Sequence, residues 1–244
     1  MRLLLLAGTP EAVQIGHALA RDRRIQATAS MARASRAPFG MILPMRIGGW
    51  GSAEAFSDWL GVHRIDAVLD ATHPFATGIT RRSAEVCAAR GVPFVQFLRP
   101  PWLPRGGDTW VFLNSERDAP QHVADGEPVF LATGRHGLME FMGFGDRPIY
   151  VRVRDRGTDT FPFPQGGFVH RPARLPVAAE VAGLRAYGVT WMVARNTGGA
   201  WTMPVIEAAR QLQIPVGMIR RPLQPEVARV QTIAEALNWV RRRI

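Results

Sequence analysis

Short continuous apolar runs alternate with apolar residues at helical spacing along the first part of the chain. The continuous runs predict buried strands at residues 2–7, 25–30, 66–71 and 93–98. The helical spacing predicts a helix from Pro10, a second from Ser52 and a third that Gly91 ends. Their apolar faces are Ala12, Ile15 and Leu19; Phe56, Trp59 and Leu60; and Ile79, Ser83, Val86 and Cys87. Strands that alternate with helices indicate an α/β fold with a parallel sheet.

The same alternation resumes after residues 99–107, a segment rich in Pro and Gly. Further strands are predicted at residues 110–114, 128–133, 149–154, 189–194 and 215–220. The strand at 149–154 is predicted to be half-exposed because its apolar and polar residues alternate, and residues 161–167 are predicted to form a loop. One more helix follows from Val205, Ala208, Ala209 and Leu212 on a common face. Thr232 and Glu235 form a capping box for a final helix that displays Ile233, Leu237 and Val240.

This pattern predicts two domains, each with its own parallel sheet. The first domain comprises residues 1–98, and residues 99–107 form the linker. The second α/β domain comprises residues 108–230, and residues 231–244 form a C-terminal helix.

Composition limits the class of protein. The chain has 244 residues, of which 47% are hydrophobic and 20% charged, as in ordinary globular proteins. The apolar run Leu3 to Ala7 is shorter than the roughly 7–15 residues of a signal peptide core, and no run approaches the ~20 residues of a membrane span. A lone Cys87 excludes an internal disulfide, and no Cys/His spacing indicates a metal site. We therefore expect a cytoplasmic protein without a membrane segment.

The charge is unusual in kind and in sign. Thirty basic residues against twenty acidic ones give +10, and every basic residue is Arg. The absence of Lys excludes Schiff-base catalysis, a Walker A loop and a Tyr-x-x-x-Lys reductase pair. The positive excess indicates an anionic partner, whether nucleic acid, phosphate or a polycarboxylate. Because the Arg residues are spread along the chain, a lined cleft is a better prediction than a disordered basic arm.

The turns that follow the predicted strands carry the candidate chemistry, because ligands of parallel sheets bind at the carboxyl ends of the strands. After the first strand, Gly8 allows close approach to the backbone, Thr9 can cap the next helix, and Pro10 suits its first position. The free N–H groups of that helix would receive a phosphate. Only the first glycine of G-x-G-x-x-G is present, so a purely structural turn is an equal alternative.

The turn after the second strand contains no acidic residue. An NAD-binding fold places an acid there to hold the ribose hydroxyls, whereas this chain has Ser30, Arg33 and Arg36. That set suits a 2′-phosphate, so a bound dinucleotide is expected to be NADP rather than NAD. A solvated basic loop is the alternative.

The turn after the third strand reads "DATHPFA", residues 70–76. Asp70 can accept backbone N–H bonds, Thr72 and His73 can cap the next helix, and Pro74 can lie in its first turn. Each residue has a structural explanation by itself. Their concentration beside two other candidate phosphate-binding turns favours a functional site.

Five segments carry a resemblance to a known family. The chain contains, in this order, "LLLAGTPEA", "DATHPFA", "ATGRHGL", "RNTGG" and "PVGMIRRP". Over nearly its whole length it resembles the precorrin-6A reductases of cobalamin biosynthesis. The resemblance implies NADPH-dependent reduction of one carbon–carbon double bond in a corrin-precursor macrocycle. It also implies two Rossmann-like domains with the active site in the cleft between them. Family members often have Lys where this chain has Arg195, which keeps the charge but changes its geometry.

The resemblance also implies roles for individual residues. Residues expected at the NADPH site are Gly8, Thr9, Glu11, Ser30, Arg33, Thr72, His73, Pro74, Phe75, Gly134, Arg135, Asn196, Gly198 and Gly199. Arg135, Arg195, Arg220 and Arg221 lie at predicted strand ends and are expected to bind the carboxylates of the macrocycle. His73, as a proton donor, and Asp70 are the candidate catalytic residues. The hydride would pass directly from the nicotinamide to the macrocycle.

Alternatives from other classes stay open at this point. The Arg content also fits a nucleic-acid-binding protein, although no known nucleic-acid-binding motif is present. An NADP-binding module with another substrate, or with no catalytic role, is a further alternative. Within the family, the macrocycle could carry cobalt or be metal-free. Neither a metal nor a flavin is implied for the protein itself, and other enzymes of the pathway are candidate partners.

Overall fold

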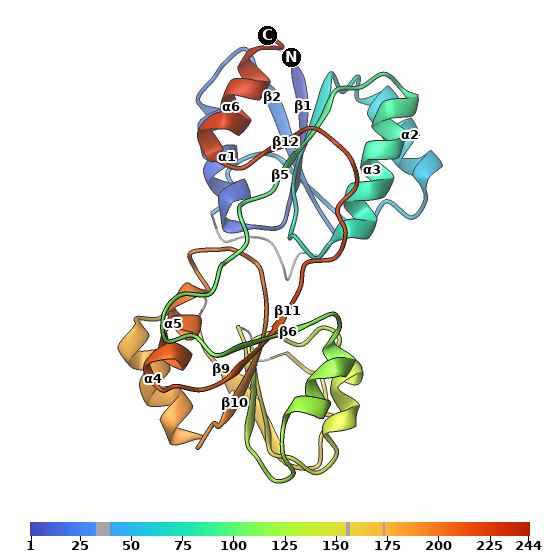
Figure 1. Cartoon of the computed structure of the whole chain (residues 1–244). Helices are drawn as coiled ribbons and strands as arrows, with labels where there is room; N and C mark the ends of the chain where they lie inside the picture. Colours follow the sequence, from blue (N-terminus) through green and yellow to red (C-terminus); the bar gives the residue numbers. More distant parts are fainter. Residues whose placement is uncertain (33–39, 155–156, 173) are drawn as a thin grey trace. The chain divides into compact units, whose positions relative to one another are not determined.

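A computed structural model describes residues 1–32, 40–154, 157–172 and 174–244. The chain divides into two compact units (Figure 1). Unit 1 consists of residues 1–100 and 222–244, and unit 2 consists of residues 101–221. Among the described residues, no helix is both long and apolar enough to cross a membrane.

Unit 1 contains a six-stranded sheet in which every strand pair is parallel. Its strands are β1 (Arg2–Ala7), β2 (Gln26–Met31), β3 (Met45–Ile47), β4 (Ala67–Ala71), β5 (Phe94–Phe97) and β12 (Arg229–Val230). Their spatial order is β12-β5-β4-β1-β2-β3. If β12 is counted as the sixth strand, this is the order 3-2-1-4-5-6 of the Rossmann fold.

Helices cover both faces of the unit 1 sheet. They are α1 (Pro10–Ala20), α2 (Ala53–Val62), α3 (Thr77–Ala89) and α6 (Ile233–Arg241), with α1 against α6 and α2 against α3. The leucines of β1 alternate between the two cores. Leu3 and Leu5 pack with α1 and α6, whereas Leu4 and Leu6 pack with the side of α2 and α3. Burial on both faces explains why β1 is a continuous apolar run.

The sheet of unit 2 has the same arrangement as that of unit 1, except that one edge strand is the first strand of the unit in sequence rather than the last. Its strands are β6 (Trp110–Leu113), β7 (Val129–Leu131), β8 (Ile149–Val153), β9 (Gly166–His170), β10 (Trp191–Arg195) and β11 (Val216–Ile219). The sheet reads β6-β11-β10-β7-β8-β9, again with parallel pairs. Its helices are α4 (Val177–Ala186), α5 (Met203–Gln211) and the 3₁₀ helices η2 (Glu116–His122) and η3 (Leu138–Phe144). The predicted α/β class with two parallel sheets is confirmed.

Several local predictions were wrong or incomplete. The strand predicted to be half-exposed, β8, lies between β7 and β9 and is almost entirely buried. Its alternating pattern misled because Arg152 is buried in an ion pair with Glu180 of α4, at 2.7 Å. The predicted loop at 161–167 overlaps the start of β9 at Gly166. The elements β3, β9, β12, α4, η2 and η3 were not predicted.

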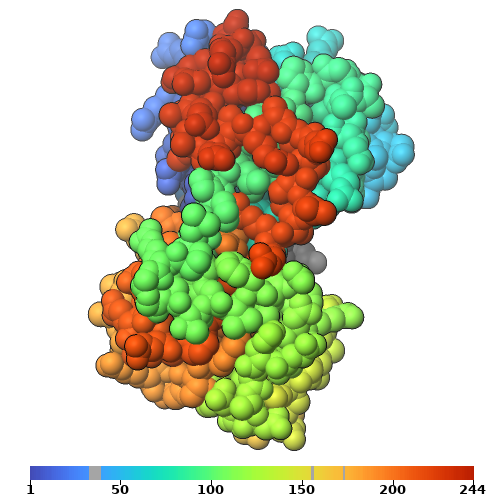
Figure 2. Space-filling model, viewed as in Figure 1, coloured from blue at the N-terminus to red at the C-terminus, as the bar shows by residue number. Residues whose placement is uncertain are grey.

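The end of the chain belongs to unit 1, which differs from the predicted domain boundaries. β12 pairs with β5, and α6 contributes Ala236, Trp239 and Val240 to the same core as β1. Figure 2 shows these C-terminal residues, in red, lying against the blue and green residues of unit 1. Thr232 caps α6 and Glu235 completes the predicted capping box. The predicted linker contains the unit boundary at Pro100, but its Trp102 is buried in the core of unit 2.

Candidate functional site

The candidate residues gather at the point in each sheet where the strand order reverses. This reversal lies between β1 and β4 in unit 1 and between β7 and β10 in unit 2. In open α/β sheets, ligands bind in the crevice outside the carboxyl ends of such strands. The segments "AGTPEA" and "DATHPFA" follow β1 and β4, while "ATGRHGL" and "RNTGG" follow β7 and β10.

The turns after β1 and β4 lie side by side. Thr9 caps α1 as predicted, since its hydroxyl accepts a hydrogen bond from the Ala12 N–H at 3.2 Å. The same hydroxyl donates to the Ala71 carbonyl at 2.9 Å, which links the end of β4 to the start of α1. A side-chain carbon added at Gly8 would lie 3.5 Å from the backbone nitrogen of His73. The absence of a side chain at Gly8 therefore keeps open the space between the two turns.

The first turn of α1 carries an ion pair that was not predicted. Glu11 accepts a hydrogen bond from the Arg99 guanidinium at 2.9 Å, and both side chains are mostly buried. Burial lowers the pKa of Arg99, and the Glu11 carboxylate opposes that change. Arg99 follows β5 at the same carboxyl edge. The strand-end criterion that selected the other turns would have found it if applied to β5.

The turn after β4 is not held in the way predicted. Thr72 and His73 do not cap the following helix, because α3 begins at Thr77 with Ala76 as its N-cap and has no side-chain cap. Instead the segment folds on itself. The Thr72 N–H donates to Asp70 at 2.9 Å, and the Phe75 N–H donates to His73 Nδ1 at 3.3 Å. The predicted backbone bond of Asp70 is thus confirmed.

The carboxyl group of Asp70 is fully buried. Its Oδ1 accepts the Thr72 N–H, whereas Oδ2 has no hydrogen-bond partner in the part of the chain that the structure describes. Burial raises the pKa of Asp70, and the nearby hydroxyls of Thr80 and Thr72, with the Thr72 N–H, oppose the rise only in part. A side chain with 0% exposure supports the turn rather than contacting reactants, which argues against the predicted catalytic role.

The turn after β2 is described only in part. Ser30 is 4% exposed and lies in register with Leu6 on β1 and Arg46 on β3. Arg33 and Arg36 lie outside the described residues. Arg46 was not predicted, because β3 is only three residues long and carries a weak strand signal. Its guanidinium stacks on Trp50 at 3.6 Å and donates to backbone carbonyls of the turn that follows β3.

In unit 2, Arg195 supports the protein itself. Its guanidinium pairs with Glu116 of η2 at 2.8 Å and donates to the carbonyls of Thr133 and His136, each at 3.2 Å. These bonds fix the turn after β7. Arg195 therefore has a structural role in this turn, and its predicted contact with substrate carboxylates stays a prediction. The planar fork of Arg makes these several bonds at once, which a Lys ammonium would not reproduce.

Asn196 and Arg221 likewise form the frame of the turn after β10. The Asn196 side chain accepts the Trp102 N–H at 2.8 Å and donates to the Trp102 carbonyl at 2.9 Å. Arg221 donates to the carbonyls of Asn196 and Thr197 at 2.8 and 2.9 Å. Gly198 has a left-handed φ of +70° and Gly199 is buried. Asn196 and Arg221 thus have internal partners, and their predicted ligand contacts stay predictions.

Two other arginines keep a different environment. Arg135 lies over the Phe168 ring at 4.3 Å, 3.5 Å from Asp159, and lines a pocket of about 240 Å³. It follows Gly134, which has a φ of +78°. Arg220 is exposed and stacks on Phe112 at 4.5 Å. In the described structure its guanidinium makes no hydrogen bond or ion pair, so it is the best placed of the four predicted arginines to bind a carboxylate.

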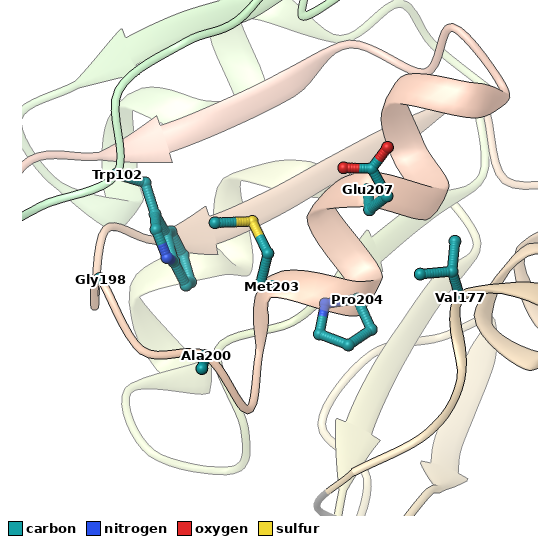
Figure 3. Close-up of a pocket in the computed structure, with 7 residues that line it drawn as sticks. All are labelled: Trp102, Val177, Gly198, Ala200, Met203, Pro204 and Glu207. Carbon is teal, nitrogen blue, oxygen red and sulfur yellow. The ribbon is translucent and has the colours of Figure 1, made fainter. Parts of the chain in front are cut away.

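A mostly apolar pocket of about 420 Å³ adjoins the turn after β10 (Figure 3). Trp102, Gly198 and Met203 form one part of its wall, and the Met203 side chain extends toward Trp102. The rest of the wall is formed by Ala200, by Val177 and by Pro204 and Glu207 of α5. Glu207 is ion-paired with Arg210, so its charge is balanced. Of these residues, only Gly198 was predicted as part of a site.

Nothing in the described ranges indicates a bound metal or a reactive thiol. No group of three or more His, Cys, Asp or Glu residues among them is arranged to hold a metal ion. Cys87 is buried, and burial raises its pKa to about 12, so its thiol stays protonated at neutral pH.

Comparisons with known proteins agree on one family. The model of the family described as "Precorrin-6x reductase CbiJ/CobK" matches residues 2–241. A precorrin-6A reductase of Rhodococcus erythropolis is 37% identical over 98% of this chain and 97% of its own length. One of Mycobacterium tuberculosis is 38% identical with the same coverage of both chains. A solved structure named "CobK precorrin-6A reductase" matches with a TM-score of 0.92 and 32% identity, over 100% of this chain and 97% of that one. The chain therefore belongs to the precorrin-6x reductase family, CbiJ/CobK, and is an oxidoreductase of cobalamin biosynthesis.

Proposed function

We propose that the chain reduces one carbon–carbon double bond of metal-free precorrin-6A with NADPH as the reductant. The two relatives described above carry the name precorrin-6A reductase, without cobalt, and match the chain from end to end. The adjacency of Gly8 and His73 at the switch point of a Rossmann-like sheet is the structural observation that carries the cofactor assignment. Bound NADPH would supply the hydride.

The residues of unit 1 fit a dinucleotide phosphate at the start of α1. Gly8 has no side chain to fill the space beside His73, and Thr9 holds the helix start in place through two hydrogen bonds. Pro10 has no N–H and the Ala12 N–H is bonded to Thr9, so the positive end of the α1 dipole is what would favour an anion there. Glu11 would repel a phosphate if it were unpaired, but Arg99 neutralises it at 2.9 Å. Arg99 thus belongs to the proposed site, although sequence reasoning missed it.

Positive charge and the lack of an acid at the end of β2 favour NADPH over NADH. Arg46 lies in register with Ser30, the predicted contact of the 2′-phosphate, and would share its donors between a phosphate and the carbonyls of Gly48 and Gly49. Arg33, predicted from the sequence, would add a second arginine. A guanidinium binds phosphate oxygens in pairs, whereas NADH offers only ribose hydroxyls at this place.

The turn at residues 72–75 would face the nicotinamide. With His73 Nδ1 accepting the Phe75 N–H, a neutral imidazole carries its proton on Nε2. In this form the Nε2–H of His73 can donate a hydrogen bond, whereas buried Asp70 only supports the turn. Donation of a proton would start from the imidazolium form of His73, in which Nδ1 is also protonated and releases the Phe75 N–H.

Unit 2 would bind the macrocycle. Arg220, which lies over Phe112, offers an uncommitted guanidinium to a carboxylate, and Arg135 lines the pocket of about 240 Å³. The apolar wall formed by Trp102 and Met203 suits the ring system rather than its acid groups. The carboxylate side chains of the macrocycle would thus face guanidinium groups, and its ring system would face an apolar wall.

The test is NADPH oxidation in the presence of purified precorrin-6A, compared with NADH. We expect turnover with NADPH and a clear preference over NADH in a fluorescence titration. Equal or tighter binding of NADH would refute the assignment at Ser30 and Arg46. His73→Ala should lose more turnover than any loss of NADPH affinity explains; unchanged turnover with intact NADPH binding would remove His73 from the proton-donor role. Turnover with only the cobalt-containing macrocycle would refute the metal-free assignment.

A further inference from the structure

A chain of side-chain hydrogen bonds ends on the turn that follows β4. The Arg229 Nε–H donates to Gln96 Oε1 at 3.2 Å, and Gln96 Nε2 donates to Gln224 Oε1 at 2.8 Å. Gln224 Nε2 then donates to the Pro74 carbonyl at 3.0 Å and to the Pro222 carbonyl at 2.9 Å. We name Arg229, Gln96 and Gln224 the glutamine relay. All its members and Pro74 belong to unit 1.

The direction of the relay is fixed by its two ends. A guanidinium can only donate, and a backbone carbonyl can only accept. Gln96 must therefore present its oxygen to Arg229 and its NH₂ to Gln224, which in turn presents its NH₂ to Pro74. Both amide orientations follow from chemistry, and hydrogen bonds aligned head to tail strengthen one another.

The relay is built into the sheet rather than spread over the surface. Gln96 is 4% exposed on β5 and lies in register with Asp70 on β4. Gln224 is half-buried and reaches Pro74 across 150 positions of sequence. Asp70 and Gln96 are paired in register on the neighbouring strands β4 and β5. The hydrogen bond from Thr72 to Asp70 and the relay bond to the Pro74 carbonyl therefore hold residues 72–74 at two points.

The relay adds an anchor from a distant part of the chain to a segment that also has local hydrogen bonds, such as that from the Ala76 N–H to the His73 carbonyl at 2.7 Å. The helix that follows has no side-chain cap, and Pro74 has no N–H of its own to donate. The Pro74 carbonyl lies directly between His73 and Phe75, so its position determines where both side chains project.

We infer that Gln224 and Gln96 are positioning residues that set the His73–Phe75 turn for the nicotinamide end of the cofactor. This inference rests on the proposed function, which places the nicotinamide at that turn. Gln224 and Gln96 touch neither reactant. They act through the Pro74 carbonyl.

Two variants interrupt the relay in different ways. Gln224→Ala removes the donor to Pro74. Gln96→Glu is nearly isosteric and keeps an acceptor for Arg229, so it should leave unit 1 folded. Its second oxygen would face Gln224 Oε1 at the present 2.8 Å, unless the Gln224 amide rotates and gives up Pro74. Either arrangement breaks the relay. Gln26→Glu, on an exposed position at the amino end of β2, is the matched control.

The readout is the affinity of each variant for two ligands, NADPH and adenosine 2′,5′-bisphosphate, which lacks the nicotinamide. We expect both relay variants to weaken NADPH binding by about three- to tenfold, the effect of one lost hydrogen bond, with adenosine 2′,5′-bisphosphate binding unchanged. The turnover number with precorrin-6A should fall in the same variants. Gln26→Glu should match the wild type in all three measurements, and melting temperatures establish that each variant is folded.

The outcomes separate the inference from the proposed function. Equal weakening of both ligands would show general damage to unit 1 and would overturn the positioning role. Unchanged NADPH binding and turnover in folded Gln96→Glu and Gln224→Ala would overturn it too. If the wild type binds adenosine 2′,5′-bisphosphate and NADPH and the variants do not differ from it, the positioning role is overturned and the proposed function stays intact. If the wild type binds neither ligand, the positioning role and the proposed function are both overturned.

Discussion

Asp70→Asn tests the claim that a buried carboxyl supports the turn after β4 at a cost in stability. Asp70 is 0% exposed, and only its Oδ1 is bonded, to the Thr72 N–H. Asparagine keeps that acceptor oxygen and removes the ionisable group. Asp70→Ala removes both, so it separates loss of the hydrogen bond from loss of the charge.

The sign of the effect follows from the raised pKa of Asp70. The folded chain binds this proton more tightly than the unfolded chain, whose carboxyl has the ordinary value of 3.8. The free energy of unfolding of the wild type is therefore greatest below that value and falls as the pH rises toward the folded-state pKa. The amide of the Asp70→Asn variant does not titrate. This variant should thus resemble the wild type near the ordinary value and exceed its stability at neutral pH.

The magnitude follows from one buried, unpartnered oxygen. Desolvation of such a group costs about 1–3 kcal/mol, so Asp70→Asn should gain about that much at neutral pH. For a chain of this size, each kcal/mol moves the melting temperature by about 2–4 °C. Asp70→Ala should instead be destabilised at acidic pH, because the Thr72 N–H loses its acceptor.

Denaturant unfolding at about pH 4 and about pH 8 measures the prediction, with exposed Asp58→Asn as the control. We expect the difference between Asp70→Asn and the wild type to grow with pH and that of Asp58→Asn to stay small. Parallel pH profiles for the wild type and Asp70→Asn would refute the reasoning, as would a loss of stability in Asp70→Asn at the higher pH.

Three further substitutions test other parts of the site. Arg220→Gln should raise the KM for the tetrapyrrole about tenfold with little change in kcat, and exposed Arg23→Gln should change neither; a loss confined to kcat would contradict carboxylate binding. Thr9→Val loses both of its hydrogen bonds and should cost about 1–3 kcal/mol in unfolding experiments, whereas Thr9→Ser should retain most of the stability. Arg195→Met should lower the free energy of unfolding by about 2–3 kcal/mol, because it leaves Glu116 and two carbonyls without their donor, and Arg195→Lys should be intermediate. Full stability of Arg195→Met with a raised KM for the tetrapyrrole would instead support its predicted role in substrate binding.

The features that sequence predicted well depend on neighbours in the chain. The caps at Thr9 and Thr232 and the helix start at Ser52 were predicted because each hydroxyl and the N–H that donates to it are only three residues apart. The four leucines of β1 likewise indicate a strand buried on both faces. These signals are local, so no knowledge of the fold is needed to interpret them.

The features that were missed depend on residues brought together by the fold. An arginine that holds backbone carbonyls, such as Arg195, has the same sequence signature as one whose guanidinium is exposed over a ring, such as Arg220. Their difference lies in Glu116, 79 positions from Arg195 in sequence. Gln224 reaches Pro74 from a segment whose only local signals are prolines. The short strands β3 and β12, of three and two residues, exist because a neighbouring strand offers a free edge.

The return of the chain to unit 1 has a consequence for biosynthesis. Multidomain proteins usually complete their N-terminal domain first as they leave the ribosome. Here the edge strand β12, the core residues of α6 and the donor Gln224 are all supplied by residues 222–244. Unit 2 can therefore finish folding while the first hundred residues still wait for the last two dozen, and a truncated transcript would yield a chain in which unit 1 is the part left unfinished.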